Sequence, residues 1–231
     1  MVPALEEILA ATKSMVFFGG AGVSTESGIP DFRSVDGLYH QKFKYPPETM
    51  LSHTFYETHT AEFFDFYRQK LIVHGAKPNA AHLRLAALER EGKCRAVVTQ
   101  NIDGLHQAAG SKTVYELHGS TLRNYCTRCG KFFPVQFIED AAGVGDGVPR
   151  CDECGGIVKP DVVLYEEGLD EETMENAVHA IRGADTLIVG GTSLAVYPAA
   201  GLLRYFRGEN LVVINKQPTP ADAMANLLIH A

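Results

Sequence analysis

Short runs of consecutive apolar residues alternate along the chain with helix-like segments. The apolar runs occupy residues 15–18, 96–99, 186–189 and 211–214. Uniformly apolar strands of this kind are typical of a parallel sheet that is buried on both faces. The helix-like segments occupy residues 2–13, 79–91, 171–182 and 198–206. The alternation predicts an α/β protein built on a Rossmann-like parallel sheet with right-handed crossovers.

Polar or glycine-rich residues follow each apolar run. The turns are G-G-A-G at 19–22, Q-N-I-D-G at 100–104, G-G-T-S at 190–193 and Asn215. Ligands of such sheets bind beyond the carboxyl ends of the strands. Glycine lets backbone amides approach a pyrophosphate, although Thr25 stands where the usual dinucleotide fingerprint has its third glycine. The first turn alone leaves a plain tight turn open, whereas two glycine turns together favour nucleotide binding.

Two stretches interrupt the alternation of strands and helices. Residues 38–77 are rich in aromatic residues and histidine, which predicts a small helical module, and residues 121–157 hold paired cysteines. We therefore expect a Rossmann-like NAD-binding domain from residues 1–37, 78–120 and 158–231, with a smaller lobe made by the other two stretches.

Four of the five cysteines are paired by spacing. Two C-x2-C motifs are separated by a gap of 21 residues, and each is followed by glycine; their cysteines are Cys126, Cys129, Cys151 and Cys154. This spacing suits tetrahedral zinc, and four thiolates close the coordination shell, which predicts a structural zinc site. A redox dithiol would need only one pair. Cys94 is most simply a small core residue.

Composition and charge narrow the class of protein. The chain has 231 residues, 45% of them hydrophobic, and a formal net charge of -7. This charge disfavours direct nucleic-acid binding and is compatible with a basic protein substrate. The first eleven residues lack the basic start and apolar run of a signal peptide, and no segment approaches the roughly 20 apolar residues of a membrane span. We therefore expect a cytoplasmic protein without a membrane partner.

Two of the nine histidines closely follow strands that end at the predicted ligand crevice. They are His106 and His118, and we expect the other seven to be surface or partly buried residues without a role. The pattern of helix 79–91 places His82 away from its apolar face. A lone histidine at a strand end is more often structural than catalytic, so the choice depends on the surrounding motifs.

Several motifs, taken in order, resemble the sirtuin family of NAD-dependent protein-lysine deacylases. They are G-A-G-V-S-T-E-S-G-I-P-D-F-R at 20–33, T-Q-N-I-D-G-L-H at 99–106, E-L-H-G-S at 116–120, the four cysteines, K-P-D-V-V at 159–163 and G-T-S-L at 191–194. The resemblance covers essentially the whole chain. It implies a deacetylase that binds NAD and an acyl-lysine protein or peptide in a cleft beside a zinc-bearing lobe, and that releases nicotinamide and O-acetyl-ADP-ribose.

The resemblance also implies the roles of individual residues. His118 matches the family's catalytic base, and His106 would position its loop. The strand with Val162, Val163 and Tyr165 would pair with the substrate peptide. The residues implied to bind NAD are Ala21, Gly22, Thr25, Asp31, Phe32, Arg33, Gln100, Asn101, Ile102, Asp103, Gly191, Thr192, Ser193 and Asn215. Imidazole, with an ordinary pKa of about 6.5, is suited to removing a proton from a ribose hydroxyl near neutral pH.

The chain departs from the family pattern in three places. Many members have F-G-E where this chain has Y-E-E at 165–167, and the extra acid favours peptides with basic flanks. Members that prefer acidic acyl groups carry Tyr-x-x-Arg in the helical module; here Asp65 precedes Arg68, which favours acetyl or other neutral groups. Members usually continue into one more helix beyond Ala231, so the adenine end of the site is expected to be the less complete part.

Two other functions remain open at this stage. ADP-ribosyl transfer to protein would use the same activated ribose with a different acceptor. A non-enzymatic module that binds zinc and nucleotide is the other alternative, and the combination of Asn101, Asp103 and His118 disfavours it.

Overall fold

The computed structural model describes residues 3–32, 37, 39 and 43–231. Its larger part is a parallel sheet of six strands in the order β3-β2-β1-β7-β8-β9. The strands are β1 (Met15–Gly19), β2 (Cys94–Thr99), β3 (Val114–Glu116), β7 (Thr186–Gly190), β8 (Asn210–Ile214) and β9 (Leu227–Ile229). Numbered within this sheet alone, the order is the 3-2-1-4-5-6 order of the Rossmann fold, which confirms the predicted class.

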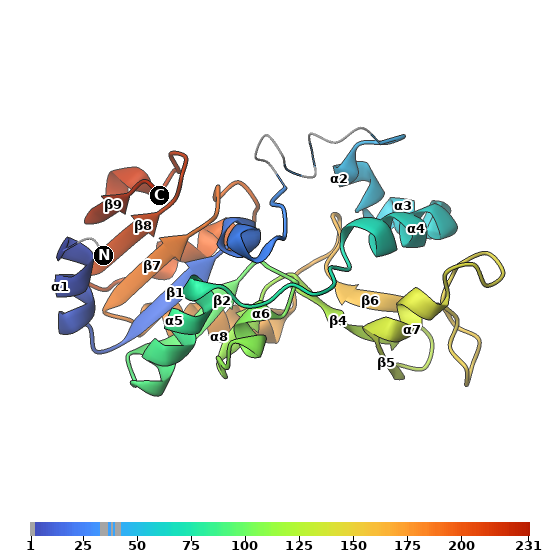
Figure 1. The fold of residues 1–231 in the computed structure, drawn as a ribbon, viewed down its shortest axis with the longest axis horizontal. Helices are drawn as coiled ribbons and strands as arrows, with labels where there is room; N and C mark the ends of the chain where they lie inside the picture. Colours follow the sequence, from blue (N-terminus) through green and yellow to red (C-terminus); the bar gives the residue numbers. More distant parts are fainter. Residues whose placement is uncertain (1–2, 33–36, 38, 40–42) are drawn as a thin grey trace.

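Helices cover both faces of this sheet (Figure 1). One core contains Val16 and Phe18 of β1 with residues from the helical segments α8 and η3, whereas Met15 and Phe17 point to a second core shared with α1 and α5. The segments in this part are α1 (Pro3–Ala11), α5 (Ala80–Arg90), α6 (Leu105–Ala108), α8 (Glu171–Arg182) and the 3-10 helices η1 (Ala21–Ser27), η3 (Ala199–Tyr205) and η4 (Asp222–Met224). Burial on both faces explains the continuous apolar runs.

The smaller lobe lies at the opposite end of the molecule (Figure 1). It contains an antiparallel sheet in the order β5-β4-β6, with β4 (Gly119–Cys126), β5 (Phe132–Pro134) and β6 (Val158–Val162), and the helix α7 (Val135–Asp140). The helices of the predicted helical module are α2 (Pro47–Met50), α3 (His53–Thr58) and α4 (Thr60–Lys70). Aromatic residues of these helices and residues of the small sheet share one hydrophobic core. Among the helices of the described residues, none is long and apolar enough to cross a membrane.

Candidate functional site

The two glycine turns meet at the point where the strand order reverses, between β1 and β7. The Gly22 amide donates to the Gly191 carbonyl at 2.8 Å, and the Gly20 amide donates to the Gly190 carbonyl at 3.2 Å. A Cβ atom on Gly22 would lie 2.8 Å from the Cα atom of Gly191. The close contact between the two turns therefore requires glycine at position 22. The same glycine would let a phosphate approach the backbone. Crevices at such switch points are the usual ligand sites of these sheets.

Replacing Gly191 by alanine is expected to destabilise the protein by about 1–3 kcal/mol. Gly191 has a φ of +59°, and an added methyl group would overlap the amide nitrogen of Val23. Gly168→Ala is the matched control, because nothing lies within 4 Å of a Cβ atom at that position. Urea unfolding of both variants measures the difference, and equal midpoints would contradict the steric argument.

A chain of hydrogen bonds joins the turn after β2 to the turn after β1. Asn101 Nδ2 donates to Ser24 Oγ at 3.0 Å, and Ser24 Oγ donates to Asp103 Oδ2 at 2.6 Å. Ser24 is 1% exposed and Asn101 is 8% exposed. Gln100 Nε2 donates to Thr192 Oγ1, at 3.0 Å, which links the third turn. The structure thus brings together residues from three separate motifs.

The other predicted cofactor residues lie in or after the strand-end turns along the chain, and Phe32 packs against the core of the smaller lobe. Ala21, Gly22 and Thr25 belong to η1, and Phe32 contacts Tyr39 edge to face, with the ring centroids 5.7 Å apart. The Ile102 carbonyl accepts a hydrogen bond from the Thr121 amide. Ser193 is exposed after β7, Asp31 is partly buried, and Asn215 follows β8, where its Nδ2 donates to the Gln217 carbonyl at 2.8 Å. Arg33 lies outside the described residues.

His118 lies between β3 and β4, below the turn after β2. Its Nδ1 is 3.0 Å from the Gln100 carbonyl oxygen. A carbonyl can only accept, so Nδ1 carries the proton and the neutral ring keeps its lone pair on Nε2. Burial lowers the pKa of His118 below its ordinary value, while the hydrogen bond to Gln100 opposes this shift. Gly119, at φ +73°, crosses β6 so closely that a side chain there would overlap the Asp161 carbonyl. The G of E-L-H-G is therefore required by packing.

The segment predicted to pair with the substrate peptide, which we call the peptide edge, contains Val162, Val163 and Tyr165. It begins at the last residue of β6 and has contacts at both ends. Val162 pairs with Gly119 and is buried in the core of the smaller lobe. The Val163 amide donates to the His118 carbonyl at 3.0 Å, and the Tyr165 amide donates to the Leu51 carbonyl at 3.0 Å. The edge is thus tied both to the histidine and to the helices.

Both acids after this edge have hydrogen-bond partners, although Glu166 is exposed. Glu167 accepts from the Leu164 amide at 2.8 Å and from Lys159 Nζ at 3.1 Å, and it lies 2.8 Å from His53 Nδ1. Glu166 Oε2 accepts from the amide and the hydroxyl of Thr54, at 2.9 and 2.7 Å. The carboxylate of Glu167 is therefore bonded to partners inside the protein. The carboxylate of Glu166 accepts hydrogen bonds from Thr54 at the start of α3.

Arg68 connects α4 with the cysteine-bearing part of the smaller lobe. Its guanidinium donates to the carbonyls of Gly147, at 2.9 Å, and of Ile138, at 3.3 Å, in the cysteine-bearing part of the lobe. Asp65 is exposed. Among the described residues, only Arg68 of the two makes hydrogen bonds at this junction, and the preference for neutral acyl groups stays a prediction.

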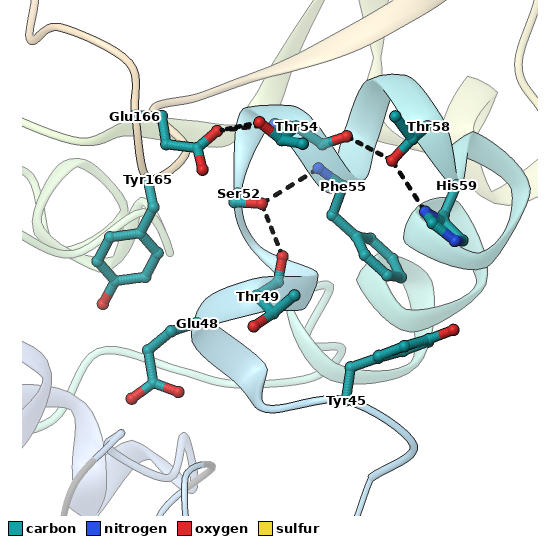
Figure 2. Close-up of a pocket in the computed structure, with 10 residues that line it drawn as sticks. All are labelled: Tyr45, Glu48, Thr49, Ser52, Thr54, Phe55, Thr58, His59, Tyr165 and Glu166. Carbon is teal, nitrogen blue, oxygen red and sulfur yellow. Dashed lines mark hydrogen bonds between the residues drawn. The ribbon is translucent and has the colours of Figure 1, made fainter.

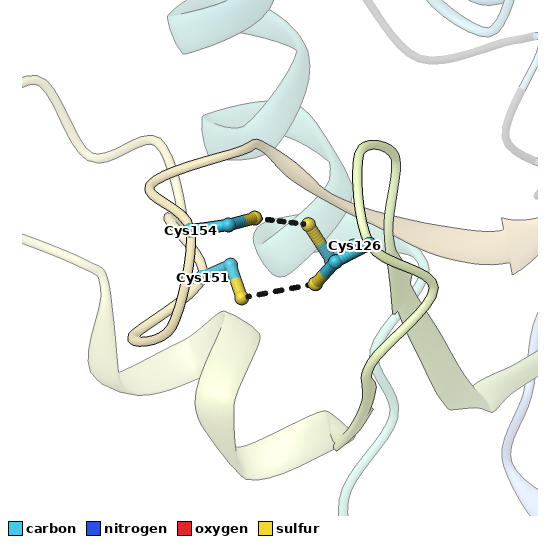
Figure 3. Close-up of side chains that lie close together, drawn as sticks. Cys126, Cys151 and Cys154 are labelled. Atoms are coloured by element: carbon cyan, nitrogen blue, oxygen red, sulfur yellow. Dashed lines mark hydrogen bonds between the residues drawn. The ribbon is translucent and has the colours of Figure 1, made fainter.

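The four predicted metal ligands converge in the smaller lobe (Figure 3). Their Sγ atoms all lie within 4.8 Å of one another, with 3.3 Å between Cys126 and Cys154 and 3.7 Å between Cys129 and Cys151. Four sulfurs at the usual Zn–S distance would be about 3.8 Å apart in a tetrahedron. None of the four forms a disulfide. The donor set and spacing therefore fit a structural zinc ion.

Two histidines are more buried than the sequence predicted. His82 is 0% exposed and His106 is 1% exposed, and their ring centroids are 4.7 Å apart. Burial lowers the pKa of His106 to about 3. Asn79, which the sequence reasoning missed, caps α5 and donates from Nδ2 to the Val23 carbonyl at 2.7 Å. Its position directly before a helix was a usable signal for the cap. His106 packs against the rings of His82 and Phe17, and its role in positioning the loop stays a prediction.

The fold and the site define a Rossmann-type nucleotide-binding protein with a closed four-cysteine metal site in a second lobe. The Sir2 family model matches residues 20–198. The chain therefore belongs to the Sir2 family.

Two relatives are named NAD-dependent protein deacetylase. One, from Clostridium acetobutylicum, is 63% identical and aligns over 97% of this chain and 91% of its own length. The other, from Clostridium perfringens, is 59% identical over 98% and 92% of the two chains.

Solved structures of similar proteins agree with this assignment. A structure of Sir2 with p53 peptide and NAD+ matches with a TM-score of 0.88 and 38% identity, over 100% of this chain and 93% of that one. A structure of Sir2 with deacetylated p53 peptide and 3'-O-acetyl ADP ribose matches with a TM-score of 0.89 and 39% identity, over 99% and 92% of the two chains.

Proposed function

We propose that this protein is an NAD-dependent protein-lysine deacetylase that releases nicotinamide and O-acetyl-ADP-ribose. The observation that carries the proposal is the tautomer of His118, whose Nδ1 is engaged by the Gln100 carbonyl and whose Nε2 is left as a base. The names of the similar proteins from Clostridium species support the same reaction.

The residues of the site have distinct tasks in this reaction. NAD supplies an activated ribose, which the acyl oxygen of the substrate attacks as nicotinamide leaves. His118 Nε2 would take the proton from a ribose hydroxyl, whose oxygen attacks the carbon of the resulting imidate. Addition of water then releases the lysine amine, and the acetyl group stays on the ribose. The bonds among Asn101, Ser24 and Asp103 fix these polar groups before the substrates bind, so little reorganisation is needed during the reaction. Phe32 helps to exclude water from the reacting ribose.

We also propose which residues bind the substrate and NAD. The acyl-lysine peptide adds along Val162, Val163 and Tyr165. NAD contacts the three turns through Ala21, Gly22, Thr25, Asp31, Phe32, Arg33, Gln100, Asn101, Ile102, Asp103, Gly191, Thr192, Ser193 and Asn215. The larger domain comprises residues 1–37, 78–120 and 158–231, the helical module residues 38–77 and the zinc module residues 121–157. Four reduced thiols suit the cytoplasm as location.

Mass spectrometry of an acetyl-lysine peptide, incubated with the zinc-loaded protein and NAD, tests this function. The expected result is loss of acetyl from the peptide, formation of O-acetyl-ADP-ribose and no reaction without NAD. Acetyl loss that proceeds equally without NAD would contradict the proposal. Transfer of ADP-ribose to protein, with the acetyl group retained, would favour the alternative reaction on this fold.

A further inference from the structure

A cavity of about 520 Å³ lies between the helices α2 and α3 and the residues that follow β6. Tyr165 forms part of its wall and also belongs to the proposed peptide edge. In Figure 2, Tyr165 lies between Glu166 on one side and Glu48 on the other. The cavity is thus beside the site of the substrate, but it does not include the residues of the three turns.

Aromatic rings, two carboxylates, the imidazole of His59 and the hydroxyl groups of serine and threonine form the walls of the cavity. The rings are those of Tyr45, Phe55 and Tyr165, and the acids are Glu48 and Glu166. The described residues that line the cavity include no lysine or arginine. Aromatic faces together with carboxylates are the usual surroundings of an ammonium or guanidinium group. The chemistry of the lining therefore fits a basic side chain.

Glu166 is exposed, but hydrogen bonds from Thr54 hold its carboxylate at the start of α3. Its φ of 77° is in the left-handed region, where a residue other than glycine is unusual. Its carboxylate accepts both hydrogen bonds from Thr54 at Oε2, which leaves Oε1 without a hydrogen-bond partner among the described residues. These contacts also lower the pKa of Glu166, so the carboxylate stays charged. A positioned anion loses less side-chain freedom when it binds a cation.

The backbone of Tyr165 connects the cavity to the peptide edge. Its amide donates to the Leu51 carbonyl, and its carbonyl accepts from the His53 amide, both at 3.0 Å. A peptide added along the edge projects alternate side chains to opposite faces. A side chain on a face turned toward α2 and α3 would reach the cavity.

We infer that this cavity is a subsite for a lysine or arginine side chain of the substrate, close in sequence to the acyl-lysine, and that Glu166 and Glu48 select it. The inference rests on the proposed function, because it assumes that the peptide lies along Val163 and Tyr165. It gives the predicted preference for basic flanks a structural basis in the extra acid itself, because Glu166 lines the cavity while Glu167 is bound by partners inside the protein.

Peptides that differ only in charge test the subsite. Arginine is placed at each position within about three residues of the acetyl-lysine, a reach of roughly 10 Å in an extended strand. Citrulline, a neutral analogue of similar shape, replaces it in the matched peptide. At one position or more, the arginine peptide is expected to have a kcat/KM about five- to tenfold higher, through a lower KM.

Three variants assign this preference to the cavity. Glu166→Gln keeps an oxygen that can accept from Thr54, so the start of α3 stays capped while the charge is lost. Both Glu166→Gln and Glu48→Gln are expected to reduce the ratio of arginine to citrulline kcat/KM to about twofold or less. Asp65→Asn removes an exposed charge from α4, outside the cavity, and the ratio should stay at the wild-type value.

The possible outcomes distinguish a failure of the proposed subsite from a failure of the proposed function. Equal kcat/KM for arginine and citrulline at every position, with NAD-dependent acetyl loss from both, would overturn the subsite and leave the deacetylase proposal intact. A preference that survives Glu166→Gln and Glu48→Gln together would also overturn it. If neither peptide loses acetyl, the deacetylase proposal fails; fluorescence anisotropy of the same labelled peptides without NAD then decides whether the arginine form binds more tightly.

Discussion

Replacing His118 by alanine is expected to lower the rate of NAD-dependent acetyl loss by a factor of about 10²–10⁴, the usual contribution of a general base. No other described histidine has its ring placed against the Gln100 carbonyl, so the structure offers no obvious substitute for Nε2. NAD binding, measured by calorimetry, should persist, because the three turns that we propose to hold the cofactor do not include this side chain.

The His118 assignment also predicts the acid limb of the pH profile. The imidazole accepts a proton only when it is neutral, and burial lowers its pKa below the ordinary value of about 6.5. As the pH falls, kcat/KM should therefore decline only once the pH passes below about 6.5, rather than above it. Circular dichroism at each pH confirms that the protein is folded where activity is lost.

A matched histidine variant completes this experiment. His74 is exposed and pairs with Glu139 in the smaller lobe, so His74→Ala should keep the turnover of the unmodified protein. Unimpaired turnover in His118→Ala, or an acid limb with its midpoint above 6.5, would refute the base assignment.

The parallel sheet could be predicted from the sequence because its central strands are buried on both faces. Every residue of β1 and β7 is buried, and such strands appear in the sequence as continuous apolar runs. The strands β3 and β9 escaped prediction because each has three residues and lies at an edge of the sheet. β4 escaped because it contains polar residues such as Asn124, which is 0% exposed and bonds to the Phe133 carbonyl.

The sequence motifs identified most residues of the candidate site, but not the hydrogen bonds between them. Ser24 connects Asn101 with Asp103, across 77 and 79 positions of the sequence, and nothing local to Ser24 reveals this. The acids at 166 and 167 show the same limit. A carboxylate has the same appearance in a sequence whether it is solvated or, like Glu167, bound by Lys159. Tertiary packing decides which partner a carboxylate binds, and only the three-dimensional structure shows that packing.

Removing the metal is expected to unfold the smaller lobe. In zinc-finger peptides, zinc contributes about 10–16 kcal/mol of apparent binding free energy at pH 7, which equals or exceeds the usual net stability of a whole domain. Cys126 and Cys151 are buried in the core that also contains Phe63 and Tyr67 of α4. Loss of the ion therefore loosens the helices as well as the small sheet. The peptide edge would be lost with them, because Tyr165 is tied to Leu51.

Cysteine variants measure this effect against a buried control. Cys151→Ala should lose bound zinc, the near-ultraviolet dichroism of the lobe's aromatic residues and acetyl turnover together. Cys94→Ala should keep its zinc, because Cys94 belongs to the core beside β1 and α5. The larger sheet has two hydrophobic cores of its own, so part of the far-ultraviolet signal should survive in Cys151→Ala. Full zinc content and unchanged unfolding in that variant would contradict a structural four-cysteine site.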